Sequence, residues 1–227
     1  MRNIPSTILN IGDNAFSECS SLLSITIPNS VTTIGTAAFW DCDSLTSAII
    51  GNGVTEIGVK AFSDCSLLNH VTIGNSVETV QDEAFSYCIS LTDITIPNSV
   101  ETIGSRAFRN CTSLRNISIP NSVTSIGTAV FYQCYDLASI TIPSSLTTIE
   151  HNMFYGCVDL SVVTIDSSSI ANNLIGKQDN GYLIDHATTI YIKTDLTTAN
   201  STYLLENFTK QATSDKAGYD MYVRNAE

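Results

Sequence analysis

Residues 91–113 read LTDITIPNSVETIGSRAFRNCTS, and this 23-residue pattern recurs along most of the 227-residue chain. Three columns of identical residues keep the same step without an insertion. The cysteines are Cys19, Cys42, Cys65, Cys88, Cys111, Cys134 and Cys157. The phenylalanines are Phe16, Phe39, Phe62, Phe85, Phe108, Phe131 and Phe154, and the leucines are Leu22, Leu45, Leu68, Leu91, Leu114, Leu137 and Leu160. A fixed period of this length indicates a solenoid, in which each repeat forms one coil.

The first half of the unit predicts a short strand and its end. Ile94-Thr95-Ile96 alternates with period two, which predicts a strand with both isoleucines inward. Pro97-Asn98-Ser99 ends that strand, because proline has no amide to give the ladder and asparagine favours a turn. Copies of the strand from successive units would therefore stack into one parallel sheet.

The second half of the unit predicts the return path. Val100 and Ile103 bring the chain inward again on an opposite wall, and Gly104 permits a tight corner. Residues 107–111, which include Ala107, Phe108 and Cys111, fit a short helical or 3₁₀ turn. A single unit offers few large apolar groups, so stability depends on stacking against neighbouring units.

The pattern Leu-x-x-Ile-x-Ile-Pro-x-x-Val-x-x-Ile-Gly-x-x-Ala-Phe-x-x-Cys resembles the BspA-type leucine-rich repeats found in surface proteins of bacteria and parasitic protists. The resemblance covers roughly residues 4–166. It implies an α/β leucine-rich-repeat solenoid, horseshoe-like and β-dominated, with a parallel sheet on one face and short helical or 3₁₀ turns. Several members of this family act in adhesion, so the resemblance also implies a secreted or cell-surface location.

The period predicts two regions. Residues 1–166 form the solenoid, with six full units over 22–159 and partial units on either side. Residues 167–227 lose the period and form an α+β cap over the last coil. We expect a strand at 188–193, a helix over 196–208 with Asp195 as its N-cap, and a closing strand at 219–223. The chain begins within a repeat, which favours missing upstream repeats or end-to-end self-association through an open edge.

The net charge of −12 argues against several classes of partner. An acidic chain repels phosphate backbones and anionic lipid, so we expect no nucleic-acid partner. No run approaches the roughly eighteen apolar residues of a membrane span, so we expect no direct membrane insertion. The first residues lack the apolar run of a signal peptide, which leaves the localisation unassigned beyond what the resemblance implies.

The residues that often carry chemistry form no recognisable site. A cysteine column predicts buried free thiols packed as small apolar groups, because stacked identical side chains point in parallel. Ligands in one line cannot surround a zinc ion tetrahedrally. His70, His151 and His186 lie in no metal or catalytic pattern. We therefore expect no catalytic residues, no metal and no cofactor.

The outward face of the strands is the candidate binding surface. Its columns are mostly serine and threonine, but the central coils break this monotony, which suggests selection for a partner. Tolerated surface variation explains the irregularity equally well. The candidate partner-binding residues are Ile49, His70, Thr72, Asp93, Thr95, Arg115, Asn116 and Ser118. Arg106, Arg109 and Arg115 also predict a basic spot, which would pair with a partner's carboxylates or with Glu101 and neighbouring acids.

The function predicted from these features is a non-enzymatic module that binds a protein or a glycan-bearing macromolecule. The alternative is a structural protein that assembles by stacking through its uncapped N-terminal repeat. Binding of ice or a crystal surface by the threonine column is less favoured, because Ile49 and Ser118 interrupt the array. An enzymatic role has no residue pattern to recommend it.

Overall fold

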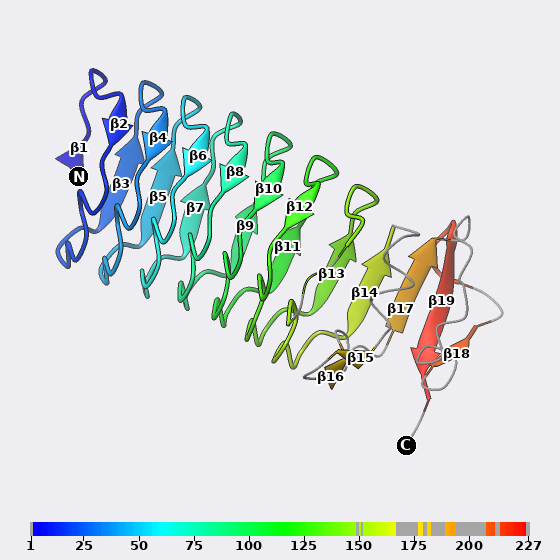
Figure 1. Ribbon diagram of the computed structural model, residues 1–227. Helices are drawn as coiled ribbons and strands as arrows, with labels where there is room; N and C mark the ends of the chain where they lie inside the picture. The colour runs from blue at the N-terminus through cyan, green and yellow to red at the C-terminus, as the bar shows by residue number, and fades with distance from the viewer. Residues whose placement is uncertain are drawn as a thin grey trace.

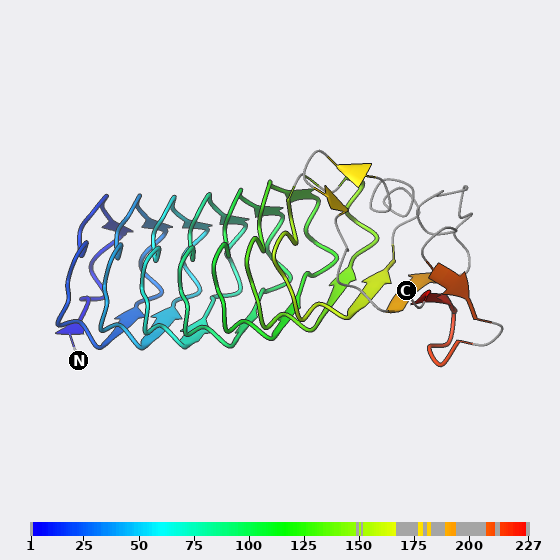
Figure 2. The same cartoon turned by 90° about the horizontal axis from the view of Figure 1, so that it is seen from below.

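The computed structural model describes residues 2–148, 150, 152–166, 177–178, 181–182, 189–193, 208–211 and 214–225. The chain forms a stack of coils that follow one another along one direction (Figures 1 and 2). We number the coils by their 23-residue units: coil 1 ends at Ser21, coil 2 is 22–44, and coil 7 is 137–159. The predicted parallel solenoid is confirmed. The described residues contain strands and turns but no helix.

The longer strands of successive coils lie side by side and form one wall, which we call the strand wall (Figure 1). Along each strand the side chains alternate between buried and exposed, as the period-two pattern predicts. The strands are β1 (Arg2–Asn3), β3 (Ser24–Ile27), β5 (Ser47–Ile50), β7 (His70–Thr72), β9 (Asp93–Thr95), β11 (Asn116–Ser118), β13 (Ser139–Ile142) and β14 (Val162–Ile165).

A second wall consists of two-residue strands paired in parallel from coil 1 to coil 6. They are β2 (Asn10–Ile11), β4 (Thr33–Ile34), β6 (Glu56–Ile57), β8 (Thr79–Val80), β10 (Thr102–Ile103) and β12 (Ser125–Ile126). Their ladder is continuous. By contrast, hydrogen-bonded pairing in the strand wall falls into three pieces, β1 to β7, β9 with β11, and β13 onward.

The third wall, which we call the turn wall, contains the residues for which we predicted helical turns. That prediction is wrong for the described coils, because each turn holds two left-handed residues four positions apart. In coil 5 these are Arg106 and Asn110, both with φ 58°. The amide of Phe108 donates to the carbonyl of Val130 in the next coil at 3.0 Å. Bonds between coils therefore replace the bonds that a helix would make within itself.

The core between the walls consists of stacked identical side chains. Successive phenylalanine rings lie nearly parallel, with centroids 5.0 Å apart between Phe39 and Phe62 and 5.9 Å apart between Phe108 and Phe131. Beside them runs the cysteine column, in which each thiol from coil 2 onward donates to a phenylalanine carbonyl of the preceding coil. The Cys111 Sγ, for example, lies 3.2 Å from the carbonyl oxygen of Phe85. Each coil is thus bonded to its neighbour through its interior.

Gly104 occupies the corner between the short-strand wall and the turn wall. A Cβ at this position would lie 2.4 Å from the backbone nitrogen of Asp82 in the preceding coil. Its φ is not in the left-handed region. We predicted glycine here for a tight corner, and the structure gives the reason as close approach between coils.

The C-terminal strands continue the stack and then reverse direction. The predicted strand at 188–193 is confirmed as β17 (Thr189–Lys193), which pairs in parallel with β14. The predicted closing strand is β19 (Tyr219–Arg224), antiparallel to both β17 and β18 (Phe208–Lys210). Phe208, assigned to the predicted helix over 196–208, lies in β18, and the rest of that helix falls outside the described residues. The division at residue 166 stays a prediction.

Two further strands, β15 (Lys177–Gln178) and β16 (Gly181–Tyr182), pair with each other. Across the described residues, no helix is long and apolar enough to cross a membrane.

Candidate binding surface on the strand face

The eight predicted partner-binding residues lie together on the exposed face of four neighbouring strands. In β9, Asp93 and Thr95 are exposed and the intervening Ile94 is buried. Parallel pairing with β11 places Asn116 beside Asp93 and Ser118 beside Thr95. Three more come from β5 and β7, where Ile49 lies beside Thr72 and His70 lies beside Ser47, and one residue directly precedes β11. All eight are exposed: Ile49, His70, Thr72, Asp93, Thr95, Arg115, Asn116 and Ser118.

An open hollow of about 430 Å³ lies over β9 and β11. Four of the predicted residues line it, namely Asp93, Thr95, Asn116 and Ser118. The sequence analysis did not select three other lining residues, Asn98, Pro120 and Ser139. The remaining four predicted residues do not line the hollow.

The hollow lies where the strand wall is least tightly closed. Strands β7, β9 and β11 have three residues each, whereas β5 and β13 have four. The inward aliphatic side chains of the three shorter strands are 4–7% exposed, as in Ile94 at 4% and Ile117 at 7%. Those of β3, β5, β13 and β14 are 0–3% exposed. The edges of apolar core residues therefore contribute to the floor of the hollow, between polar residues on its rim.

The charges near the hollow are solvated. The Nε of Arg115 lies 3.7 Å from Oδ2 of Asp136, and both side chains are exposed. The hydroxyl of Thr92 donates to Oδ2 of Asp93 at 3.1 Å. An exposed pair of this kind contributes at most about 1 kcal/mol. Arg115 and Asp93 can therefore exchange these contacts for contacts with a bound partner at little cost in free energy.

The predicted basic spot is divided between two walls. Arg106 and Arg109 belong to the turn wall, whereas Arg115 directly precedes β11 in the strand wall. Arg106 pairs with Glu83 at 3.6 Å, not with Glu101. The three arginines therefore do not form one basic surface.

A C-terminal turn covers the far end of the strand face. The Nζ of Lys216 donates to the hydroxyl of Thr164 at 3.0 Å, which leaves Thr164 only 5% exposed. The same ammonium lies 4.2 Å from the ring centroid of Tyr219, whose hydroxyl donates to Asp166. The hydroxyl of Tyr191 donates to Asp215, and this hydrogen bond raises the pKa of the tyrosine. The strand face is thus open over coils 2–7 and closed at β14.

The sequence analysis did not predict the turn at Lys216. Lys216 and Thr164 are 52 residues apart, and no repeat relates them.

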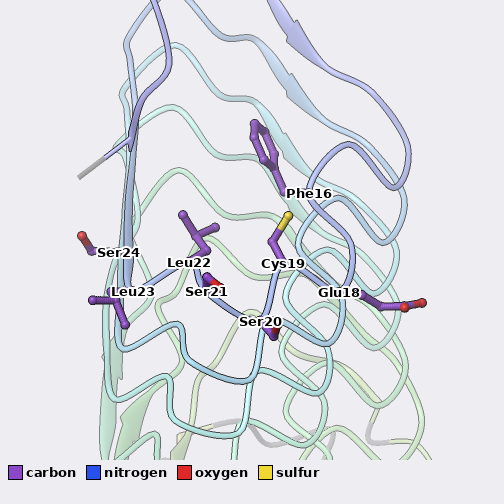
Figure 3. A pocket seen from close by; sticks show the side chains of 8 residues that line it. All are labelled: Phe16, Glu18, Cys19, Ser20, Ser21, Leu22, Leu23 and Ser24. Atoms are coloured by element: carbon purple, nitrogen blue, oxygen red, sulfur yellow. The ribbon is translucent and has the colours of Figure 1, made fainter.

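The first coil exposes its interior. An apolar hollow of about 410 Å³ is lined by residues such as Ile4, Ile8 and Phe16. A neighbouring hollow follows residues 18–24, where Phe16, Cys19 and Leu22 point into the coil and Glu18 points away (Figure 3). At the opposite end of the stack, β17 is already paired with β19. Self-association through coil 1 remains a prediction.

The cysteines are free thiols, and six of the seven are buried; Cys19 is exposed. Burial raises the pKa of Cys111 and of Cys157 to about 12. A thiol with such a pKa is protonated at neutral pH, so it acts as a donor to the phenylalanine carbonyl and not as a nucleophile. Across the described residues, no group of three or more His, Cys, Asp or Glu is arranged to hold a metal ion.

The geometry defines a class: a β-solenoid repeat protein whose strand face is exposed. The profile of the BspA type leucine rich repeat region (six copies) matches residues 2–112 and 78–204. The chain belongs to this family of leucine-rich-repeat proteins, which are generally non-enzymatic.

Two solved structures are similar to the chain. A leucine-rich repeat protein of Treponema pallidum (T. pallidum, TpLRR) shares 25% identity at a TM-score of 0.66, over 72% of this chain and 85% of that one. A leucine-rich repeat protein from Bacteroides ovatus shares 31% identity at a TM-score of 0.65, over 86% of this chain. The chain spans only 55% of the Bacteroides protein. No curated protein sequence matches the chain.

Proposed function

We propose that this chain is a non-enzymatic binding module that holds a macromolecular partner, a protein or a glycan-bearing protein, on its strand face. The observation that carries this proposal is the hollow over β9 and β11, where four of the residues selected from the sequence line an opening in the strand wall. Membership of a leucine-rich-repeat family supports a binding role. We extend the same proposal to adhesion at a cell surface.

The chemistry of the hollow suits a partner segment with one apolar group and several hydrogen-bonding groups. Its floor includes the edges of Ile94 and Ile117, and its rim offers Asp93, Asn116 and Ser118. Apolar contact at the centre with a polar rim is the usual anatomy of a protein interface.

The test is binding of extracellular proteins and glycoproteins to the immobilised chain, with single substitutions that fill the hollow. We expect Thr95→Arg and Ser118→Arg to abolish a specific interaction, because the added side chains occupy the hollow. Thr26→Arg is the matched control, since Thr26 is exposed on β3 outside the hollow. A specific partner that tolerates both hollow substitutions would place the binding surface elsewhere.

A second candidate function is assembly through coil 1, favoured by the apolar hollow around Ile8. At the opposite end of the stack, the edge of β17 is already paired with β19, so two copies would meet through their first coils. Sedimentation analysis of Ile8→Lys against the unchanged chain tests this candidate. An association unaffected by Ile8→Lys contradicts it.

A further inference from the structure

The exposed apolar side chains of the described residues concentrate on one part of the turn wall. Of ten large apolar side chains that are exposed, five lie on the turn wall of coils 4, 6 and 7. On the strand face Ile49 is exposed, and so is Leu23, which directly precedes β3. The five, whose exposed fractions run from 38% to 54%, are Tyr87, Ile89, Tyr135, Tyr155 and Val158. Exposed apolar side chains gathered on one wall in this way are typical of an interaction site.

Arg109 lies on the same part of the turn wall, with its guanidinium over two rings. Its guanidinium carbon is 5.5 Å from the ring centroid of Tyr87 and 5.3 Å from that of Tyr132. Tyr132 in turn stacks on Tyr155, with centroids 5.0 Å apart. Coils 4 to 7 thus carry a continuous series of stacked planar groups, which we call the tyrosine–arginine stack.

Arg109 has no carboxylate partner among the described residues, although Arg106 and Arg115 each have one. This is notable in a chain with 22 acidic and 10 basic residues. Arg109 is partly exposed, and its guanidinium lies over the rings of Tyr87 and Tyr132. A planar guanidinium held in this way is suited to a carboxylate, with which it can form two parallel hydrogen bonds.

The other half of the same wall is acidic. Coils 1 to 3 carry Glu18, Asp41 and Asp64 at positions equivalent to Tyr87, and coil 2 carries Asp43 at the position equivalent to Ile89 and Tyr135. Oδ2 of Asp64 accepts hydrogen bonds from Trp40 Nε1 at 2.9 Å and from Ser63 Oγ at 2.6 Å, which fix its orientation. Partial burial and then the carboxylates of Asp43, Asp64 and Glu18 raise the pKa of Asp41. Lys60, a cation on this half of the wall, is paired with Glu83 at 3.6 Å.

The acidic half and the tyrosine–arginine stack are complementary by symmetry. Coils 2–7 have 23 residues each, so two such stacks laid side by side in opposite directions stay in step. A two-fold axis through coil 4 brings coil 3 of one copy onto coil 5 of the other, and coil 2 onto coil 6. An isologous contact of this kind uses the same surface twice.

We propose that the turn wall binds a second copy of the chain, antiparallel, about a two-fold axis at Tyr87 and Ile89 of coil 4. Arg109 of each copy then meets Asp64 of the other copy. The hydroxyl of Tyr135 reaches Asp43 of the other copy in the same way. Ile89 meets its own equivalent at the axis, where an apolar contact needs no complementary charge.

The stacking also argues against a sugar as the occupant. A pyranose binds to tyrosine through a free ring face, but Arg109 covers faces of Tyr87 and Tyr132, and Tyr132 and Tyr155 cover each other. Tyrosine and arginine in this arrangement are the residues enriched at protein interfaces.

The test is sedimentation velocity of the whole chain over a wide concentration range, without any partner. We expect a reversible monomer–dimer equilibrium in the unchanged chain. Arg109→Glu places a carboxylate opposite Asp64, and Asp64→Lys places an ammonium opposite Arg109. Each variant alone should raise the dissociation constant at least about tenfold, because each creates two like-charge contacts across the axis.

The decisive measurement is a mixture of these two variants. In a mixed dimer, Glu at position 109 meets Lys at position 64, and the unchanged Arg109 meets the unchanged Asp64. The mixture should therefore dimerise although neither variant does so alone. Circular dichroism of each variant establishes that it is folded.

Three results would overturn the proposal. One is an unchanged chain that stays monomeric at every concentration, and another is a mixture that stays monomeric when both variants are folded. The third is a dimer that survives Arg109→Glu and Ile89→Lys but dissociates with Ile8→Lys, which would place the contact at coil 1. Binding at the strand face is measured separately with Thr95→Arg, so this proposal and the proposed function can fail independently.

Discussion

The strand wall and the turn wall follow the same 23-residue step but differ in how they tolerate variation. The outward strand column is nearly uniform: Thr26, Ile49, Thr72, Thr95, Ser118, Thr141 and Thr164. A column of the turn wall reads Ser17, Trp40, Ser63, Ser86, Arg109, Tyr132 and Tyr155, in which Ser63 and Ser86 are buried and Tyr155 is exposed. On the strand wall, side chains must fit a pleated surface. On the turn wall the backbone between coils is held by amide bonds and buried thiols, and the side chains of this column vary in size, charge and burial.

The difference shows that the backbone of this fold can repeat regularly while the residue types on its surface change from coil to coil. The hydrogen-bonded ladder of the strand wall is interrupted at its centre, and its hollow is polar at the rim. The turn wall keeps its bonds between coils over the described coils, and its surface is strongly polarised between acidic and aromatic halves. The following experiments test that contrast, from the largest expected effect to the smallest.

Alkaline pH should destabilise the turn wall through its thiols. Cys111 and Cys157 have ordinary pKa values of 9.0 and folded pKa values of about 12, so the folded state retains protons that the unfolded state loses between these values. The free energy of unfolding is therefore full below pH 9 and falls as the pH rises toward about 12. The loss is on the order of 4 kcal/mol for each thiol at most.

Urea denaturation at a series of pH values measures this loss. The double variant Cys111→Ala/Cys157→Ala should show a shallower pH dependence than the unchanged chain. An equal dependence in both proteins would mean that the thiols do not cause it.

Phe108→Ala should destabilise the protein by about 3–5 kcal/mol, because it leaves a cavity in the ring stack behind the turn wall. Ile94→Ala, behind the opened part of the strand wall, should cost about 2 kcal/mol, at the lower end of its usual range. Ile94 is 4% exposed and Phe108 is fully buried. Chemical denaturation compares the two variants. A larger loss for Ile94→Ala would reverse the ranking of the two walls.

Cys88→Ala should lower the free energy of unfolding by about 1–3 kcal/mol. The thiol of Cys88 is fully buried and donates to the carbonyl of Phe62 at 3.2 Å, and both its volume and its hydrogen bond are lost. Cys19→Ala is the matched control, because Cys19 is exposed. Thermal and urea unfolding should leave the control within about 0.5 kcal/mol of the unchanged chain. Equal losses in the two variants would contradict a structural role for the buried thiols.

Ala37→Gly should stabilise the protein by up to about 1 kcal/mol, since Ala37 adopts φ 52°, a region in which a Cβ is strained. The neighbouring Ala38 is fully buried and is not in the left-handed region. Ala38→Gly should therefore destabilise by about 1 kcal/mol. The two adjacent substitutions should therefore change the free energy of unfolding in opposite directions. In a helix, both substitutions would lower it. Unfolding midpoints at fixed pH measure the difference.

Much of the strand wall could be predicted from the sequence, because period-two alternation and a constant repeat fix both the face and the register of each residue. That is why Asp93, Thr95, Asn116 and Ser118 were placed together correctly. The hollow over β9 and β11 could not be predicted, since coils of equal length carry no sign that the ladder is interrupted on either side of this pair. The cover over Thr164 depends on a contact with Lys216, outside the repeat.

The turn wall was predicted less well. A helical turn was expected from residues 107–111, although asparagine, which occupies the left-handed position 110, is enriched at φ above zero. Arginine at the other left-handed position, 106, carries no such signal. A further signal was available: Arg109 and Tyr132 are 23 residues apart and therefore share a column, which predicts that they lie in contact. In this wall, a shared column predicts which side chains lie in contact better than residue type predicts the backbone conformation.

The hydrogen bonds from thiol to carbonyl all point the same way along the stack, each coil donating backward and accepting from the coil that follows. Removal or duplication of one whole unit would rejoin equivalent donors and acceptors, so the length of the rod can change by recombination without redesign of its interior. The same event would displace the midpoint of the turn wall. A lineage could thereby gain or lose the symmetric pairing of two molecules while every individual coil remained intact.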